Sequence, residues 1–349
     1  MEENITDMGR CYFLTEVMQI PEGPTYVTAI ITCILNSIFA LTATVSNTVL
    51  LLMILRHPNL HTPSNVLLGC LALSDLVIGC ITQPAYVTYK VAEILVLKRA
   101  SCVARVIHWV VGWICAGVSM LTITALAVER FLALHLHLRY AVVVTVRKVV
   151  LTATLFWIAA FLIIMSLFVL KSDKYWTFVP APILVSNVII TFTAYWKIFR
   201  ILQKHRSQIQ DQIQAQVSRF GGNQLGSVTI NIKRYRKSAV TAMYVLVLLL
   251  LCYIPFFCAM VTRVVVGYSA AVKIAYESGA TVVYLNSTLN PILFCYRVPD
   301  IRREVKKLFD RINCMKRKGS PVVNVELSSA RHNKSVNVLD RPEIKMLYW

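Results

Sequence analysis

The sequence is poor in charged residues. Only 15% of its 349 residues are Asp, Glu, Lys or Arg, while 57% are hydrophobic. Soluble domains are typically roughly 25% charged and roughly 45–50% apolar. A soluble chain of this length would form more than one domain, and each domain would need a polar surface. The composition therefore argues against a soluble multidomain protein and against a disordered chain.

Acidic residues are the scarcer charge, with 17 Asp and Glu against 36 Lys and Arg, for a formal net charge of +19. Such an excess can indicate nucleic-acid binding, but the interpretation depends on where the basic residues lie along the chain. Seven stretches approach or exceed the roughly 20 apolar residues that a membrane-spanning helix needs. Five of them contain no charged residue, one contains only Asp75, and one contains only Glu277. The stretches are Tyr26–Leu55, Thr62–Tyr89, Val106–Val128, Val149–Leu170, Tyr175–Trp196, Ser238–Thr262 and Ile274–Tyr296. They predict an all-α membrane protein, a seven-transmembrane helix bundle.

The basic residues predict the orientation of the bundle. With the N-terminus outside, 27 of the 36 Lys and Arg residues lie on the cytoplasmic side, as the positive-inside rule requires. The outer side is then nearly neutral, and nucleic acid is not expected as a partner. No cleavable signal peptide is expected, because the first 25 residues lack a basic start followed by an apolar stretch. Asn4 begins a glycosylation sequon on the outer side. We predict a multi-pass protein of the plasma membrane.

We expect four regions along the chain: an extracellular segment 1–25, the bundle 26–296, a cytoplasmic amphipathic helix 297–314 and a disordered tail 315–349. The helix is predicted because Ile301, Val305 and Leu308 share one face, while basic residues lie off it. Such a helix contacts membrane lipids at the inner leaflet. Cys314 follows it as a candidate palmitoylation site, with an unmodified thiol as the alternative.

Short motifs occur in order along these stretches, one for each of several helices. They are Asn47, Leu71–Leu76, Ala127–Phe131, Trp157, Cys252–Pro255 and Asn286–Phe294. Together they resemble the rhodopsin-like (class A) G-protein-coupled receptors, and the resemblance covers residues 26–314. A short second outer loop without cysteine, and Asn187 in place of the usual helix-five proline, make the melanocortin, cannabinoid, lysophospholipid and adenosine branch the nearest in pattern.

The resemblance implies a receptor, not an enzyme, so no catalytic residue is expected. An extracellular ligand would move helix six outward and activate a heterotrimeric G protein, with arrestin as a further partner. The alternative is a seven-helix transporter or ion pump. We disfavour it because the chain has no internal repeat and a single buried acid. It also lacks the lysine that binds retinal, since Tyr284 occupies that position.

The resemblance implies a role in activation or G-protein coupling for several residues. They are Glu129, Arg130, Leu138, Tyr195, Tyr253, Pro255, Asn290, Pro291 and Phe294. In the resting receptor Arg130 would pair with Glu129. The alternative is an ordinary solvated ion pair at the surface. Tyr253 and Phe294 replace a usual tryptophan and a usual tyrosine. The base of helix six carries no acid in Lys233–Lys237, so we predict basal activity.

The resemblance also implies a sodium ion, held by oxygen ligands from Asp75, Ser119, Asn286, Ser287 and Asn290. A hydrogen-bonded cluster without an ion is the alternative. No other cofactor is expected.

The ligand-binding site is predicted mainly from the family residues that this sequence lacks. Amine receptors place an aspartate eighteen residues before the helix-three arginine, and this chain has Gly112 there. The candidate pocket residues are Tyr86, Trp109, Gly112, Trp113, Met260 and Tyr284, with ordinary packing as the alternative. Charged residues such as Glu93, Arg105 and Lys273 are expected on its rim. We predict a lipid-like or peptide ligand. Cys11 and Cys102, the outer-side cysteines outside the spans, are candidate disulfide partners.

Overall fold

The computed structural model describes residues 7–11, 17–136, 139–170, 182–183, 185–201, 203, 251–263, 265–267, 269–297, 301–307 and 310. The chain divides into two compact units, Met1–Lys306 and Lys307–Trp349. All the helices and strands from β1 to α10 lie in the first unit. The predicted spans Tyr175–Trp196 and Ser238–Thr262 are described only in part, as helical residues within 185–201 and Leu251–Arg263.

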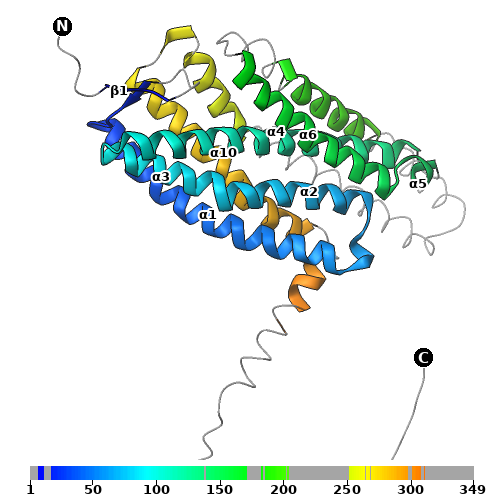
Figure 1. The fold of residues 1–349 in the computed structure, drawn as a ribbon. Coiled ribbons are helices and arrows are strands. Elements are labelled where there is room, and N and C mark those ends of the chain that lie inside the picture. Colours follow the sequence, from blue (N-terminus) through cyan, green and yellow to red (C-terminus); the bar gives the residue numbers. More distant parts are fainter. Residues whose placement is uncertain are drawn as a thin grey trace, which may run out of the picture. The chain divides into compact units, whose positions relative to one another are not determined.

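The described part of the unit is a bundle of long helices (Figure 1). The long elements are α1 (Pro24–Arg56), α2 (Pro63–Val77), α3 (Gln83–Ile94), α4 (Lys98–Leu136), α6 (Val146–Leu170) and α10 (Ala270–Arg297), and the short π-helical turn η2 (Ile78–Thr82) joins α2 to α3. Two short helical turns, η1 (Pro58–Leu60) and α5 (Tyr140–Val143), lie between them. α1 packs against α2, α3 and α10, and α4 packs against α2, α3 and α6.

Four helices among the described residues are long and apolar enough to cross a membrane. They are Pro24–Arg56, Pro63–Ile94, Lys98–Leu136 and Val146–Ser166. Each contains or largely coincides with a predicted span, and α4 extends well beyond the predicted Val106–Val128. The predicted seventh span lies inside α10, whose lower apolar content follows from the polar side chains that it buries, among them Glu277, Asn286 and Asn290.

The second span is one helix with a local change of winding. Thr62 caps its start by accepting a hydrogen bond from the Asn65 amide at 3.3 Å, and Pro63 occupies the first turn, where its missing N–H is not needed. The π-helical turn η2 then separates α2 from α3. Gly79 within η2 lets α1 approach closely, because a Cβ there would lie 2.8 Å from the Thr44 hydroxyl oxygen.

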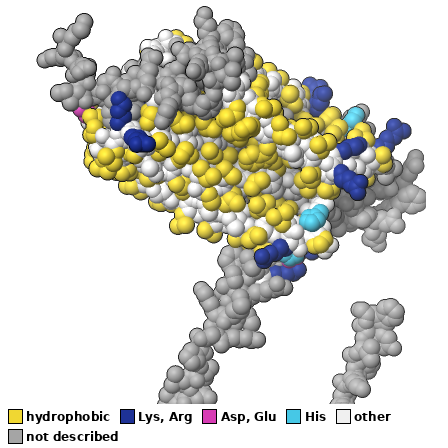
Figure 2. All heavy atoms as spheres, in the orientation of Figure 1, with side chains coloured by type: hydrophobic (Ala, Val, Ile, Leu, Met, Phe, Trp, Pro, Cys, Tyr) yellow, Lys and Arg dark blue, Asp and Glu magenta, His cyan; other side chains and the backbone are white. Residues whose placement is uncertain are grey.

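The bundle exposes apolar side chains and buries polar ones. Leu41 on α1 is 68% exposed, whereas Asn36, Asn47 and Asp75 are at most 1% exposed. Figure 2 shows hydrophobic side chains over the middle of the visible face and Lys and Arg toward the ends of the helices. This is the arrangement expected for helices in lipid.

A two-stranded hairpin precedes the bundle, and the sequence did not predict it. β1 (Asp7–Arg10) pairs antiparallel with β2 (Val17–Gln19), with an irregular register between Asp7 and Gly9. A two-stranded sheet is only marginally stable alone. It follows that the hairpin needs an attachment to the bundle.

Candidate ligand pocket and activation site

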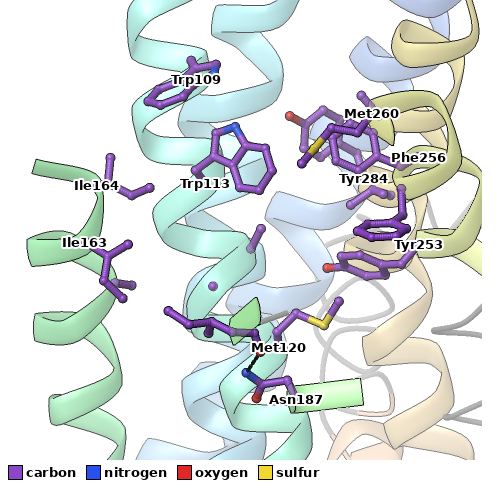
Figure 3. A pocket seen from close by; sticks show the side chains of 18 of the residues that line it. Trp109, Trp113, Met120, Ile163, Ile164, Asn187, Tyr253, Phe256, Met260 and Tyr284 are labelled. Atoms are coloured by element: carbon purple, nitrogen blue, oxygen red, sulfur yellow. Dashed lines mark hydrogen bonds between the residues drawn. The ribbon is translucent and has the colours of Figure 1, made fainter. Parts of the chain in front are cut away.

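A cavity of about 160 Å³ lies inside the bundle (Figure 3). Its walls come from α4, α6, the helical residues 185–201, Leu251–Arg263 and α10. Trp113 of α4 faces the ring of Phe256, with centroids 6.1 Å apart, and Trp109 lies 6.4 Å from Trp113. Engineered cavities of similar volume with apolar walls bind small aromatic molecules. The cavity is therefore suited to a compact apolar guest.

The cavity wall is uncharged. None of the described residues that line it is Asp, Glu, Lys or Arg. Its polar atoms belong to aromatic rings, to His108 and to Asn187, whose side chain accepts a hydrogen bond from the Thr124 hydroxyl at 3.1 Å. Gly112 lines the cavity at the position where an amine receptor would carry its aspartate. An ammonium group would have no counter-ion among these lining residues, and burying it there is costly.

Five of the six residues that the sequence assigned to the pocket line it: Trp109, Gly112, Trp113, Met260 and Tyr284. Tyr86 is the exception, because it is not among the residues that line the cavity. It is 1% exposed, and its hydroxyl donates to the Thr32 hydroxyl at 2.9 Å, so it packs against α1 instead of facing the cavity. Sequence reasoning missed His108 and Met120 as lining residues, because helix periodicity does not fix which α4 residues face the cavity.

A buried ionic network lies at the outer end of α3, α4 and α10. The sequence placed several of its charged residues on the rim of the pocket, but the structure buries them against one another. Lys90 donates to Glu93 at 3.0 Å and also to Glu277, and Arg105 lies 3.2 Å from Glu93. All four residues are at most 5% exposed, and Lys273 nearby is 3% exposed. The interpretation that the chain has a single buried acid was also wrong. Charges that neutralise one another can be buried on apolar helices, and pairing across helices cannot be read from one sequence.

The outer hairpin is attached to α4 by a disulfide. Cys11, which follows β1, is bonded to Cys102 with their Cα atoms 5.3 Å apart. The structure thus joins the two outer-side candidate cysteines. Cys11 is fully buried, and Trp109 of the cavity wall packs in the same cluster. The bond holds the N-terminal segment against the outer turns of α4.

A polar cluster surrounds Asp75 near the end of α2, well inside the longer membrane helix Pro63–Ile94. The Asn290 amide donates to the Asp75 carboxylate at 2.8 Å, Ser287 is a further side-chain partner, and Asp75 is 1% exposed. Ser119 is hydrogen-bonded to Ser74 at 2.9 Å. Asn286 is 4% exposed on the same helix as Asn290. The candidate sodium ligands from α4 and α10 are therefore buried polar groups, as a shared cluster requires.

The cytoplasmic end of α4 carries the acid–arginine pair. The Arg130 guanidinium lies 3.6 Å from the Glu129 carboxylate, which is buried while Arg130 is exposed. Two further donors hold Glu129: the Ser64 hydroxyl at 2.8 Å and the Tyr140 hydroxyl of α5. Burial and the hydrogen bond to Glu129 raise the pKa of Tyr140, so this phenol stays protonated and donates. Sequence reasoning missed Ser64 and Tyr140 as partners of this pair.

Among the other activation residues, Tyr253 links the cavity to an apolar cluster. Tyr253 lines the cavity and also packs against the cluster of Leu50, Leu71 and Ile123, in which Phe294 is 6% exposed. Phe294 lacks the usual tyrosine hydroxyl, and this is compatible with its apolar surroundings. Pro255 lies within Leu251–Arg263, Pro291 lies inside α10, and Tyr195 is half-buried in 185–201.

Three predicted sites lie outside the described residues: Asn4, Leu138 and Cys314. The helix after the seventh span is described over residues 301–307. There Ile301 is fully buried, Val305 packs against the same apolar cluster, and Arg302, Arg303 and Lys306 are exposed. The expected apolar and basic faces are present in that segment.

The described helices and the cavity between them fit a membrane receptor built as a helix bundle, and comparison with known proteins identifies the family. The model for the 7 transmembrane receptor (rhodopsin family) matches residues 46–177 and 172–294. The chain belongs to this family. It is a G-protein-coupled receptor of the plasma membrane and not an enzyme, and nothing in the comparison supports the transporter alternative.

Individual relatives are distant. Trace amine-associated receptor 7d of Mus musculus is 22% identical over 289 residues, covering 76% of this chain and 78% of that receptor. 5-Hydroxytryptamine receptor 1F of Rattus norvegicus is 24% identical over 341 residues, covering 77% of this chain and 90% of that receptor. The predicted melanocortin, cannabinoid, lysophospholipid and adenosine branch stays a prediction.

Proposed function

We propose that this receptor responds to an uncharged, largely apolar small molecule that binds in the cavity between α4, α6, 251–263 and α10. The observation that carries the proposal is the cavity wall, which is aromatic and aliphatic and has no charged residue among its described members. The names of the two relatives refer to amines, but Gly112 removes the expected counter-ion here. A lipid-like ligand fits this wall better than a charged peptide.

Binding would reach the G protein through helix six. Tyr253 contacts both the cavity and the apolar cluster that holds Phe294, so a ligand that displaces Tyr253 would also disturb this cluster. Pro255 lies two residues further along, and a proline removes one helical hydrogen bond, which makes this a point of bending. The Glu129–Arg130 pair would then open toward the G protein. Arrestin is proposed as a second cytoplasmic partner.

We also propose a sodium ion at the polar cluster. The buried Asp75 carboxylate, hydroxyl oxygens of Ser119 and Ser287, and amide oxygens of Asn286 and Asn290 are the donors that a hard cation prefers. A bound cation would offset the cost of burying the carboxylate. Sodium is expected to lower basal nucleotide exchange in the wild-type receptor and to have no effect in Asp75→Asn.

The experiment for the ligand class uses the full chain in nanodiscs with a purified G protein. Nucleotide exchange is measured with a short-chain neutral alcohol, indole, tryptamine and a cationic peptide. We expect stimulation by a neutral compound and loss of that stimulation in Ala116→Phe, which fills the cavity. Ala159→Phe places the same ring on the exposed face of α6 and is the matched control. Stimulation only by tryptamine or by the peptide would overturn the proposal.

A further inference from the structure

One imidazole ring connects the cavity to the second span. His108 of α4 lines the cavity, and its ring lies edge-on to the rings of Tyr86 and Tyr284, with centroids 5.3 and 5.8 Å away. Its Nδ1 is 3.2 Å from the backbone carbonyl oxygen of Thr82. Its Nε2 is 3.4 Å from the hydroxyl oxygen of Tyr284. Both ring nitrogens therefore face an oxygen atom.

The direction of these two hydrogen bonds follows from the donors available. A carbonyl oxygen only accepts, so Nδ1 of the neutral ring must carry the proton and donate to Thr82. Nε2 then has only a lone pair, and the Tyr284 hydroxyl must donate to it. A phenol has a single proton. With that proton directed to His108, the Tyr284 oxygen is left with its acceptor lone pairs.

A glycine of the cavity wall lies beside this oxygen. Gly112 lies one helical turn after His108, and both Gly112 and Tyr284 line the cavity. A Cβ at Gly112 would lie 3.5 Å from the Tyr284 hydroxyl oxygen and 3.1 Å from a Thr82 methyl carbon. Because glycine has no Cβ, no side chain from this position stands between a guest and the Tyr284 oxygen.

We propose that His108 sets the hydrogen-bond polarity of the cavity, so that it selects an uncharged apolar molecule that donates a hydrogen bond through an O–H or N–H group. Tyr284 is the contact residue, and His108 is a positioning residue that acts through it. This inference rests on the proposed function, because it assumes that an apolar guest occupies the cavity.

The test uses two probes of nearly equal size and opposite polarity. Indole offers an N–H donor, whereas benzofuran has an oxygen acceptor in its place and no donor. The dissociation constant of each is obtained from the concentration dependence of the melting temperature of the purified full-length receptor. One hydrogen bond corresponds to a roughly 2- to 10-fold difference in affinity. We expect indole to bind more tightly by about this factor.

Three variants locate the source of the preference. His108→Phe keeps an aromatic ring between the tyrosines but removes the acceptor, so the Tyr284 proton can turn to the cavity and the preference should shift toward benzofuran. Tyr284→Phe should abolish the preference. Tyr296→Phe removes a tyrosine hydroxyl of α10 that is exposed and lies outside the cavity wall, and it should leave the preference unchanged. The two probes are compared within one variant, so a change in stability alone does not alter the result.

The outcomes separate this inference from the proposed function. Equal affinities, or tighter binding of benzofuran to the wild-type receptor, would overturn the inference and leave the apolar ligand class intact. An indole preference that survives in His108→Phe would overturn the role of His108. If neither probe raised the melting temperature, both the inference and the proposed cavity would be wrong. If His108→Phe does not fold, Tyr284→Phe still shows whether the Tyr284 hydroxyl oxygen causes the preference between the two probes.

Discussion

The buried ionic network makes a specific prediction about stability. Lys90→Met removes the cation that bonds to Glu277, and it leaves Glu93 its contact with Arg105. The Lys90 and Glu93 side chains are fully buried, and the Glu277 side chain is 5% exposed. Removing one partner of a buried ion pair typically costs about 3–5 kcal/mol, because the remaining charge stays in a medium of low polarity. We expect a loss of this size.

The measurement is thermal unfolding of the detergent-solubilised receptor, with cell-surface expression as a second readout. Lys98→Met removes an exposed lysine at the same end of the bundle and should change stability by less than about 0.5 kcal/mol. The double variant Lys90→Met with Glu277→Gln should be more stable than Lys90→Met alone, because the unpaired carboxylate becomes neutral. A single variant within about 1 kcal/mol of wild type, or a double variant less stable than the single, would refute this reasoning.

Three further predictions concern other parts of the bundle. Tyr140→Phe removes a donor to the buried Glu129 carboxylate, and basal nucleotide exchange on a purified G protein should rise severalfold; an unchanged rate would contradict the role of this hydrogen bond. Cys102→Ser opens the disulfide and should lower stability by about 2–5 kcal/mol in thermal unfolding. Gly79→Ala forces a methyl group to 2.8 Å from a threonine hydroxyl of α1 and should cost about 1–3 kcal/mol, whereas Gly69→Ala, with its nearest neighbour at 3.8 Å, should not destabilise.

Much of the architecture could be predicted from the sequence because lipid imposes a simple rule. Backbone groups in the hydrocarbon region must bond within one helix, so long charge-free stretches such as Val149–Leu170 predict spans directly. The ends of the helices were less predictable. α4 continues from Lys98 to Leu136, because charged residues are tolerated where a helix leaves the apolar region. The hairpin was missed because its strands are three and four residues long.

The site was predicted in part, and the misses share one cause. Trp113 and Met260 were assigned to the cavity correctly from their place along the helices. Tyr86 was not, because a rotation of the helix by one position decides whether a side chain faces the cavity or α1. Lys90 and Glu277 are 187 residues apart, and only the packed bundle brings them together. Contacts between helices depend on rotation and tilt, and a single sequence does not encode either in a pattern that can be read.

The central claim is that this chain passes a signal to a G protein through the pair at the end of α4. The most direct test is nucleotide exchange on a purified heterotrimeric G protein with the full-length receptor in nanodiscs and no added ligand. We expect exchange above that of empty nanodiscs, because the base of helix six carries no acid to hold Arg130 at rest. We also expect Arg130→Ala to return the rate to the empty-nanodisc level. A wild-type rate equal to that of empty nanodiscs, or one unaffected by Arg130→Ala, would contradict it.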